Sequence, residues 1–297
     1  MPTPVKIDRL RVYLSNYQED KKDFLIEGFT YGFHLQYEGE RGFQFSNNLT
    51  SALEQPDLVS TKLCKEVEAG RMAGPFQDPP LSDLKVSPLG IVPKKTPNSY
   101  RLIHNLSYPN KKEGSVNAGI SDESAAVHYS GIGEAILAVK AMGKQSFLCK
   151  TDIRSAFRIL PVHPSDYELL GIQWNGVYYV DRCLPMGCRT SCKIFEEFSS
   201  ALEWIAINKL GISAMVDILD DFLIVEQTQE ACLSSFKKFL ALCEDIGVPL
   251  SADKTVLPTQ VIEFVGITVD VKLSQTRLPA DKLEKCKSFL QKFFAYG

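Results

Sequence analysis

The stretch MVDILDDFLIV, residues 215–225, constrains the fold more than any other part of the chain, because it places three aspartates in an otherwise apolar run. The segments AMVDIL and FLIVE both have strand character, and Asp220 and Asp221 lie where one strand would turn into the next. Aspartate is common in turns, so a solvated hairpin tip would explain the pair without any function. The apolar flanks on both sides favour instead a buried hairpin that presents two carboxylates at its tip.

A second apolar segment, SFLCKTD at residues 146–152, has the pattern of a buried strand and also ends on an aspartate, Asp152. Carboxylates held close together in a partly buried site repel one another unless a proton or a cation intervenes. Oxygen ligands of this kind suit Mg²⁺ or Mn²⁺, and a pair of such ions can activate a hydroxyl and stabilise a leaving phosphate oxygen. Asp152, Asp220 and Asp221 therefore indicate the chemistry of nucleotidyl transfer.

A basic segment, residues 85–112, carries six lysines and arginines and no acidic residue. Within it, PLGIVPKK and YRLIHNL are strand-like and TPNS has turn chemistry, which predicts a hairpin with Lys94, Lys95 and Arg101 around its tip. Such a tip can bind phosphates, because arginine offers a bidentate fork and lysine a point charge. A solvated edge hairpin that uses lysines against aggregation is the alternative. The remaining basic residues of the segment are Lys85, Lys111 and Lys112.

The composition excludes several classes of protein. With 297 residues, 44% of them hydrophobic, the chain can form one large domain or two ordinary ones. Its net charge of −3 gives no global attraction to nucleic acid, so any such binding has to come from local patches. The cysteines are scattered without a C-x-x-C pair, and no apolar run is long enough for a membrane span. We therefore expect an intracellular protein, cytoplasmic or nuclear, with no membrane partner.

The order of the expected elements predicts a mixed fold. Thr3 has the character of a helix N-cap, with Pro4 at the first helical position. The Asn175-Gly176 dipeptide between two short aromatic segments predicts a hairpin. Hairpins mixed with helices favour an α+β fold. Further helices are expected at residues 131–143, 188–211, 229–246 and 280–295.

Seven sequence blocks are informative together because of the order and the spacing in which they follow one another along the chain. They are LGIVPKKTPNSYRLIHNLS, FLCKTDIRSAFRILPV, CLPMGCRTSCKIF, DILDDFLIV, GVPLSADKT, EFVGITVD and LPADKLEKC. Together they resemble the motif series of reverse transcriptases, over roughly residues 70–290. The segments TPVKIDRLRVYLSNY, EVEAGRMAGPF and LPADKLEKC resemble in particular the DIRS and Ngaro group of retrotransposons.

The resemblance implies a right-hand polymerase fold, with a palm of antiparallel sheet and packed helices, fingers, and a truncated thumb. Because the chain stops soon after what would be the first thumb helix, we expect weak processivity. The implied parts are a helical N-terminal extension (1–70), fingers (71–115), palm (116–159), fingers (160–187), palm with the catalytic hairpin and primer grip (188–270), and the start of the thumb (271–297).

The resemblance also assigns roles to the acidic residues. Asp152 matches the first metal-binding aspartate, and Asp220 with Asp221 match the paired aspartates of the catalytic hairpin. With the backbone carbonyl of Ile153, they would hold two Mg²⁺ ions, for which Mn²⁺ can substitute. Lys254 matches a lysine near the pyrophosphate, where it could donate a proton or stabilise charge; taken alone it is a surface lysine. Asp217 matches no family role, and we expect it to be structural.

Other matched positions concern the nucleotide and the primer. Phe157 matches the aromatic residue that leaves no room for a 2′-hydroxyl, although a phenylalanine taken alone is more often a core residue. Gly187 would allow the backbone to approach the nascent base pair, or simply lie in a loop. The full set for the nucleotide is Lys94, Lys95, Arg101, Phe157, Met186 and Gly187, and that for the primer grip is Phe264, Val265 and Gly266.

The chain departs from the family pattern at three places. In the family, an aromatic residue followed by any residue often precedes the aspartate pair, whereas here Ile218-Leu219 precedes it. This difference alters the contact with the primer end. Met186 replaces a polar residue of some relatives, which alters the base-pair and ribose contacts. Asn105 stands where the family has an aspartate in the second fingers strand.

These features predict the RNA-directed DNA polymerase core of a retrotransposon. Its partners would be an RNA or DNA template with a primer, deoxynucleoside triphosphates, and separate ribonuclease H or recombinase domains of the same element. Two alternatives stay open. One is a catalytically silent, transposon-derived fragment that binds nucleic acid or a partner protein. The other is a related nucleotidyltransferase that uses no template or only a DNA template.

Overall fold

The computed structural model describes residues 1–94, 98–109, 114–127 and 129–295, and the chain divides into two compact units. The first unit comprises Met1–Val127 and Ser155–Phe198, and the second comprises His128–Arg154 and Ser199–Gly297. The chain passes from the first unit to the second for the last time between Phe198 and Ser199, inside helix α7 (Ser191–Asn208). Each unit combines helices with β-sheet, which confirms the expected α+β class.

The first unit contains a five-stranded sheet with the order β1-β3-β7-β8-β2 and a separate hairpin of β4 and β5. Asn175 and Gly176 join β7 to β8 with φ angles of 50° and 81°, as in a type I′ turn, which confirms the predicted hairpin. The strands are β1 (Gln44–Phe45), β2 (Met72–Phe76), β3 (Lys85–Val86), β4 (Leu89–Pro93), β5 (Tyr100–His104), β7 (Gly171–Trp174) and β8 (Val177–Asp181).

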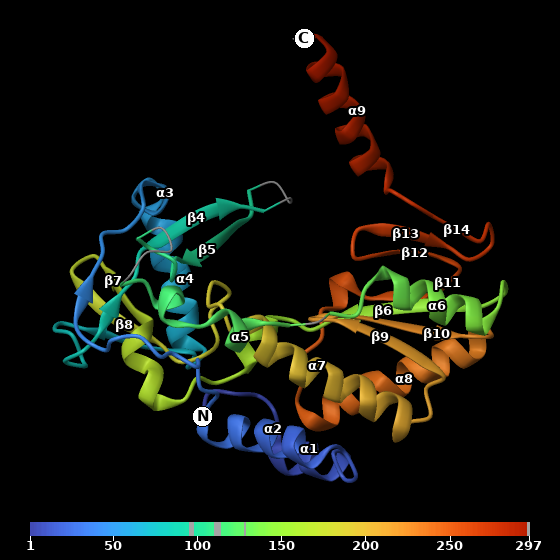
Figure 1. Ribbon diagram of the computed structural model, residues 1–297, viewed down its shortest axis with the longest axis horizontal. Coiled ribbons are helices and arrows are strands. Elements are labelled where there is room, and N and C mark those ends of the chain that lie inside the picture. Colours follow the sequence, from blue (N-terminus) through green and yellow to red (C-terminus); the bar gives the residue numbers. More distant parts are fainter. Residues whose placement is uncertain (95–97, 110–113, 128, 296–297) are drawn as a thin grey trace. The chain divides into compact units, whose positions relative to one another are not determined.

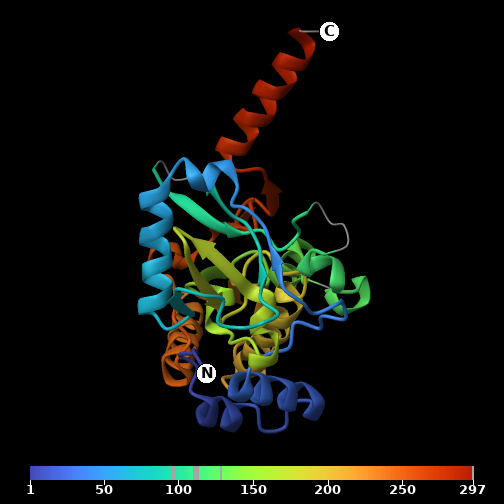
Figure 2. The same ribbon diagram turned by 90° about the vertical axis from the view of Figure 1, so that its left-hand side faces the viewer.

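The helices of the first unit include α1 and α2, which pack against each other (Figures 1 and 2). The expected helix start at Thr3 and Pro4 is wrong. Helix α1 begins at Ile7, and the Thr3 hydroxyl donates instead to the Ile159 carbonyl at 2.6 Å. Besides part of α7, the helices are α1 (Ile7–Tyr13), α2 (Glu19–Tyr31), α3 (Thr50–Leu53), α4 (Pro56–Glu68) and α5 (Asp122–Ala125), with 3-10 turns η1 (Val116–Gly119), η2 (Ala156–Ile159) and η3 (Pro164–Leu170).

The second unit is built on a four-stranded sheet with the order β11-β6-β10-β9, next to a three-stranded sheet with the order β12-β13-β14. The strands are β6 (Phe147–Asp152), β9 (Ala214–Ile218), β10 (Asp221–Glu226), β11 (Val256–Thr259), β12 (Val261–Phe264), β13 (Ile267–Asp270) and β14 (Gln275–Arg277). The helices are α6 (Ile132–Met142), the rest of α7, α8 (Gln229–Ile246) and α9 (Ala280–Ala295), with the 3-10 turn η4 (Ala252–Lys254). Each of the four expected later helices is therefore present.

Different helices cover the two faces of the four-stranded sheet (Figure 1). On one face, Leu148 of β6 packs in an apolar cluster with Ala135 of α6. On the other face, the Phe222 ring of β10 lies 5.2 Å from the Phe239 ring of α8. Because side chains alternate along a strand, Asp152 points to the same face as Leu148.

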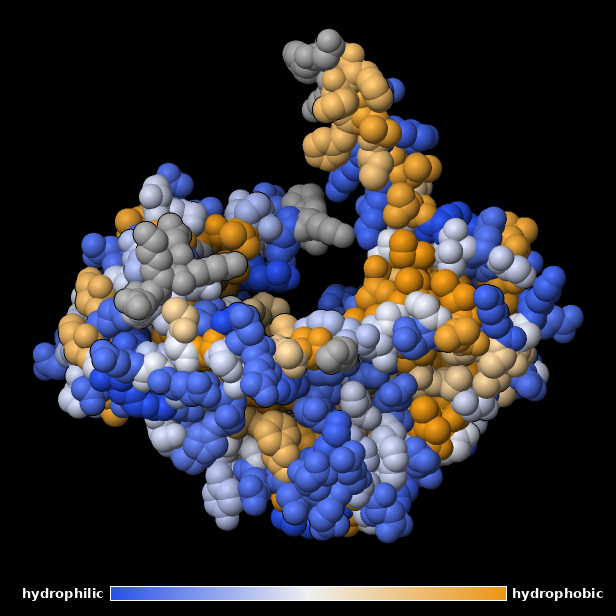
Figure 3. Space-filling model, viewed as in Figure 1, coloured by the Kyte–Doolittle hydropathy of each residue, from blue (hydrophilic) through white to orange (hydrophobic). Residues whose placement is uncertain are grey.

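Helix α9 carries apolar side chains that stay exposed to solvent (Figure 3). They are Leu283, Phe289, Leu290, Phe293 and Phe294. Despite this apolar surface, neither α9 nor any other helix in the described ranges has the length and hydropathy needed to span a membrane.

Candidate active site

The three aspartates expected to bind metal lie together in the second unit. Asp221 begins β10 and is the register partner of Asp152, the last residue of β6. Asp220 lies in the tight turn from β9 to β10 beside Leu219, whose φ is 55°. The Asp220 carbonyl accepts a hydrogen bond of 2.9 Å from the Ile153 amide. The register of the strands thus brings carboxylates that are distant in sequence to one end of the sheet.

Both carboxylate oxygens of Asp152 accept hydrogen bonds from other side chains. Ser251 Oγ donates to Oδ1 at 2.8 Å, and Lys254 Nζ donates to Oδ2 at 2.5 Å. The Ser251 amide also donates to the Asp152 carbonyl at 2.8 Å, which fastens the start of η4 to the end of β6. Lys254 therefore lies at the carboxylate site rather than on an unrelated surface. The sequence did not single out Ser251, because a serine in the GVPLSADKT block carries no distinctive pattern.

The ionisable side chains of this site shift one another's pKa values. Burial, repulsion from Asp152 and a hydrogen bond shared with Asp152 raise the pKa of Asp220 to about 6. Burial and the charge of Asp152 also raise the pKa of Asp221, against the opposing charges of Lys150 and Lys254. Burial disfavours the charged form of Lys254, but its hydrogen bond to Asp152 and the neighbouring carboxylates outweigh burial and raise its pKa. The site therefore favours an added proton or cation.

The chemistry of this donor set fits a divalent cation. Its carboxylates are hard oxygen ligands, and their burial and mutual repulsion would be relieved by a bound Mg²⁺ or Mn²⁺. The side chains do not close around an ion as they stand: within the residues that the structure describes, no group of three or more His, Cys, Asp or Glu side chains is arranged to hold one. Both oxygens of Asp152 are instead engaged by Ser251 and Lys254.

Ile153, whose carbonyl is expected to complete the ligand set, forms an isolated antiparallel bridge with Leu250. The hydrogen bonds of this bridge are made by the residues next to Ile153 and Leu250. The Arg154 amide donates to the Pro249 carbonyl at 2.9 Å, and the Ser251 amide donates to the Asp152 carbonyl. The bridge therefore leaves the Ile153 carbonyl available to another partner.

Asp217 points to the other face of the sheet. It pairs in register with Phe222, whose ring packs against α8, and it is buried. The Ser199 hydroxyl of α7 donates to its carboxylate, and burial raises the pKa of Asp217. This position separates Asp217 from the carboxylates on the Asp152 face and agrees with a structural role.

In the first unit, β4 and β5 form the expected basic hairpin. Val92 pairs with Arg101, and the Lys94 amide donates to the Ser99 carbonyl at 2.7 Å. Lys94 and Arg101 are both exposed at the end of this hairpin. Burial and the charge of Lys94 lower the pKa of Lys62 on α4, so a third cation lies near the hairpin. The sequence did not reveal Lys62, because it lies in a separate amphipathic helix.

The basic surface is smaller than the sequence indicated. Lys85 is buried in β3, where it pairs with Gln44 of β1, so it adds no exposed charge to the hairpin. Lys95, expected at the hairpin tip, lies outside the described residues, as do Lys111 and Lys112.

Phe157 lies in the 3-10 turn η2, half-buried, with its ring 5.3 Å from the ring of Phe195. The next residue, Arg158, anchors this turn: its guanidinium donates to Asp181 at 2.7 Å and to Glu66 at 2.9 Å. These contacts fix the backbone of η2 while part of the Phe157 ring stays accessible.

Met186 and Gly187 are exposed in the loop before α7. A Cβ atom at Gly187 would lie 2.7 Å from the carbonyl oxygen of His104, so this position requires glycine for close backbone approach. Asn117 Nδ2 donates to the Gly187 carbonyl at 2.8 Å, and the Arg189 amide donates to Asn117 Oδ1 at 2.9 Å. Asn117 therefore holds the loop from both sides, a role that the sequence did not indicate.

Of the three residues expected in the primer grip, Phe264 is fully buried in the core of the second unit. Val265 and Gly266 form the turn between β12 and β13, with φ angles of 41° and 77°. Val265 is 41% exposed, so the turn presents an apolar side chain to solvent.

The expected residues are shared between the two units. The second unit holds the carboxylates, Ile153, Lys254 and the β12–β13 turn. The first unit holds the described residues expected to bind the nucleotide, which are Lys94, Arg101, Phe157, Met186 and Gly187.

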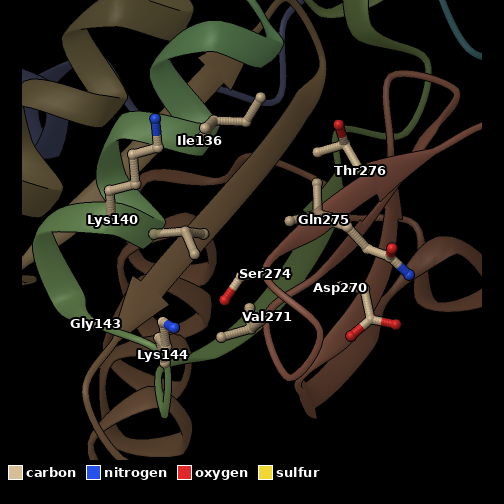
Figure 4. Close-up of a pocket in the computed structure, with 11 residues that line it drawn as sticks. Ile136, Lys140, Gly143, Lys144, Asp270, Val271, Ser274, Gln275 and Thr276 are labelled. Carbon is tan, nitrogen blue, oxygen red and sulfur yellow. The ribbon is translucent and has the colours of Figure 1, made fainter.

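A cavity of about 390 Å³ lies in the second unit beside α6, β13 and β14 (Figure 4). Ile136 and Val139 of α6 and Val271 give it an apolar lining. The Asp270 carboxylate at this cavity accepts a hydrogen bond from Arg277 Nη1 at 2.7 Å. Among the described lining residues, none is an expected site residue. The carboxylate site thus lies elsewhere, at the end of the four-stranded sheet.

Comparison with known proteins identifies relatives of the sequence. Residues 92–269 match the family described as "Reverse transcriptase (RNA-dependent DNA polymerase)". The chain is 27% identical over 126 residues to the genome polyprotein of Petunia vein clearing virus, which covers 42% of this chain and 6% of that protein. It is 23% identical over 142 residues to protein P of duck hepatitis B virus, which covers 48% of this chain and 18% of that protein. The chain thus spans a small part of these curated relatives.

Solved structures resemble the fold over most of the chain. The protease-reverse transcriptase of a foamy virus in complex with an RNA/DNA hybrid has a TM-score of 0.64 at 16% identity, over 95% of this chain and 37% of that one. A foamy viral protease-reverse transcriptase in complex with double-stranded DNA has a TM-score of 0.63 at 16% identity, over 95% of this chain and 49% of that one. This likeness confirms the expected right-hand polymerase fold.

Proposed function

Because this chain belongs to the reverse transcriptase family, we propose that it is an RNA-directed DNA polymerase core that adds deoxynucleotides to the 3′-hydroxyl of a primer. One observation carries the proposal. Asp152 and Asp221 face each other at the end of β6 and β10, and burial and repulsion raise the pKa of the adjacent Asp220 to about 6. Carboxylates with raised pKa values that cluster in this way are typical of sites that bind a cation or a substrate.

We assign the metal-binding role to Asp152, Asp220, Asp221 and the Ile153 carbonyl. Bound there, two Mg²⁺ ions would lower the pKa of the primer 3′-hydroxyl and neutralise charge on the departing phosphate oxygens. The three carboxylates supply the negative charge that makes such binding favourable, and the antiparallel pairing of β6 with β10 fixes their backbones. The pairing therefore preorganises the backbone positions of Asp152 and Asp221 before a metal ion binds.

Lys254 has two roles in this proposal. In the free site it donates to Asp152 Oδ2 at 2.5 Å and offsets part of the carboxylate charge. During the reaction its ammonium would stabilise the pyrophosphate or donate a proton to it. Its raised pKa keeps Lys254 protonated at neutral pH, which suits either role.

Exposed cations and one aromatic ring of the first unit are the candidates for nucleotide binding. Lys94 and Arg101 at the end of the β4–β5 hairpin would bind the triphosphate, since both side chains are exposed. The accessible part of the Phe157 ring would exclude a 2′-hydroxyl and so select deoxynucleotides. Gly187 and Met186 would contact the nascent base pair, and Asn117 holds that loop in place.

The template is proposed to be RNA, with DNA as a second substrate. The foamy viral enzymes of similar fold were solved with an RNA/DNA hybrid and with double-stranded DNA. Because the net charge of this chain is −3, binding would depend on local basic residues and weaken steeply with added salt. The β12–β13 turn, with exposed Val265, would contact the primer strand.

The finer assignments rest on the sequence blocks. We propose an origin in a retrotransposon of the DIRS and Ngaro group, with ribonuclease H and recombinase domains of the same element as partners. The proposed parts are the N-terminal extension (1–70), fingers (71–115 and 160–187), palm (116–159 and 188–270) and the start of the thumb (271–297). The β9–β10 hairpin and the β12–β13 turn both fall in the second palm segment.

A catalytically silent protein that binds nucleic acid is the second candidate. The observation in its favour is that Lys254 and Ser251 engage both oxygens of Asp152, and no three potential ligands in the described residues close around an ion. Such a protein would retain the fold and the basic hairpin without transferring nucleotides.

Primer extension on matched templates separates these functions. The purified chain is given a labelled primer on an RNA template, on a DNA template of the same sequence, and alone, each with Mg²⁺ and then Mn²⁺. Extension on RNA that follows the template sequence supports the proposal. Binding of the RNA–primer duplex without extension would favour the silent protein, and extension only on DNA or without template would favour a different nucleotidyltransferase.

A further inference from the structure

The turn between β12 and β13 has a strained backbone. Val265 and Gly266 both have positive φ, 41° and 77°, as a type I′ turn requires. Glycine adopts this conformation readily, but a β-branched valine is a clear outlier there. Strained residues persist only where the surrounding structure holds them, and they concentrate at functional sites. The contacts of this turn should therefore explain how it is held.

Two lysine ammonium groups bind the backbone of this hairpin. Lys150 Nζ donates to the Glu263 carbonyl at 2.5 Å, and Lys282 Nζ donates to the Gly266 carbonyl at 2.7 Å. The two lysines belong to β6 and to α9, which are far apart in sequence. Strand β12 lies at the edge of its sheet, so its outward carbonyl groups are open to such donors. The hairpin is thus fastened at its tip and along its edge.

Lys150 connects the hairpin to the carboxylate site. It lies two residues before Asp152 on β6, so both side chains point to the same face of the sheet. The same strand therefore carries a proposed metal ligand and the donor that holds Glu263. A shift of β12 away from β6 beyond the reach of the Lys150 side chain would break this hydrogen bond.

The Lys282 ammonium group occupies the space that a side chain at Gly266 would take. A Cβ atom at Gly266 would collide with Lys282 Nζ. The positive φ favours glycine here, and a side chain in its place would displace the end of Lys282 from the turn. This contact ties the turn to the first residues of α9 (Figure 1).

We propose that Lys150 and Lys282 are positioning residues for the primer strand: they hold the β12–β13 turn in its strained conformation and at a fixed place relative to the Asp152 strand. The inference rests on the proposed polymerase function and deepens it. Val265 of this turn is exposed, and under the proposed function it would contact the sugar-phosphate backbone near the primer 3′ end. The attachment of the turn to β6 sets the register of that end with the carboxylates, and its attachment to α9 fixes the tip of the turn.

The test compares the full chain with Lys150→Met and Lys282→Met. Lys285→Met is the matched control for Lys282→Met, because it removes the same charge from an exposed position of α9. The first measurement is the fraction of bound primer ends that is extended in a single turnover. Loss of one charge-assisted hydrogen bond should lower this fraction roughly tenfold in either variant. The deoxynucleotide concentration for half-maximal rate and the thermal midpoint should stay close to those of the unchanged chain, and Lys282→Arg should restore the fraction.

A second measurement is independent of activity. Amide hydrogen exchange at residues 263–268 of the free protein should be faster in Lys150→Met and Lys282→Met, and unchanged in Lys285→Met. If the unchanged chain extends primers while both variants extend the same fraction as Lys285→Met, the inference is overturned and the polymerase function stands. Unchanged exchange in both variants would also overturn it. If the unchanged chain extends no primer, the proposed function fails, and the positioning role fails with it.

Discussion

Asp152 and Asp221 face each other across neighbouring antiparallel strands as register partners. Like charges directly opposite in a sheet destabilise it. The adjacent Asp220 adds a third carboxylate, and burial and repulsion raise its pKa to about 6. This repulsion therefore destabilises the β6–β10 sheet at the end where the proposed chemistry takes place, and a bound cation should strengthen it.

Mg²⁺ should stabilise the protein through these carboxylates. At a concentration about ten times its dissociation constant, a ligand that binds only the folded state adds about 1.4 kcal/mol to the free energy of unfolding. Thermal unfolding with Mg²⁺ and with a chelator would measure this difference. Asp220→Asn should lose most of it, because one ligand is gone, whereas Asp253→Asn on the exposed η4 turn should keep it. Equal stabilisation of all three proteins would contradict the metal assignment.

Lys254 should affect turnover more than binding. Lys254→Met removes the donor to Asp152 Oδ2 and the charge near the proposed pyrophosphate position, so the single-turnover rate should fall roughly a hundredfold. Lys254→Arg separates the two proposed roles, because arginine keeps the charge but does not release a proton. Recovery of the rate with arginine would indicate charge stabilisation, and no recovery would indicate proton donation. A normal rate in Lys254→Met, measured by rapid-quench primer extension, would exclude both.

Replacing glycine by alanine should change the stability of the protein in opposite directions at two positions. Gly187→Ala places a Cβ 2.7 Å from the His104 carbonyl oxygen, so the backbone must shift and the protein should lose about 1 to 3 kcal/mol of stability. A Cβ at Gly133 in α6 meets nothing within 4 Å, so Gly133→Ala should gain about 1 kcal/mol from helix propensity. Denaturant unfolding measures both. Equal stability of the two variants would mean that the loop at Gly187 has room for a side chain.

His104 should make the protein sensitive to acid. Burial lowers its pKa from 6.5 to about 4, with Arg158 adding to the effect and Asp181 opposing it. Its Nε2 lies 3.2 Å from the Gly171 carbonyl, and its buried Nδ1 has no partner within the described ranges. Because the folded pKa is below the unfolded one, the contribution is complete above pH 6.5 and is lost as the pH falls toward 4.

The variant His104→Gln isolates this effect. The unchanged chain should lose up to about 3 kcal/mol more than the variant between those two pH values, since the variant has no group to protonate. Denaturant unfolding at a series of pH values gives the difference. Parallel curves for the two proteins would show that His104 is protonated as easily in the folded state as in the unfolded one.

Much of the fold could be predicted because local patterns agree with the final structure. The hairpin at Asn175-Gly176, the strand ending at Asp152 and the helices at 229–246 and 280–295 all follow from turn chemistry or periodicity. The start of α1 could not be predicted in this way. The Thr3 hydroxyl finds a partner in Ile159, more than a hundred residues away, and such a tertiary contact overrides a local capping signal.

The candidate site was predictable in its residue types but not in its contacts. The carboxylates were visible as acids in apolar strands, and the structure brings Asp152 and Asp221 together through strand register. Ser251 and Lys150 carry no pattern of their own, because a serine or lysine acquires its role only from the backbone or carboxylate that it meets. For Lys85 the sequence was misleading in the opposite way. It was counted in an exposed basic segment, but its side chain is buried in the fold.

Template-directed primer extension with the aspartate variants tests the central claim most directly. Asp152→Asn and Asp220→Asn should fold and bind the RNA–primer duplex but extend it at least a hundredfold more slowly than the unchanged chain. Asp253→Asn, the same change on a neighbouring exposed carboxylate, should extend it at the normal rate. Equal extension by Asp152→Asn, Asp220→Asn and Asp253→Asn would contradict the claim that the carboxylates at the end of β6 and β10 form the active site.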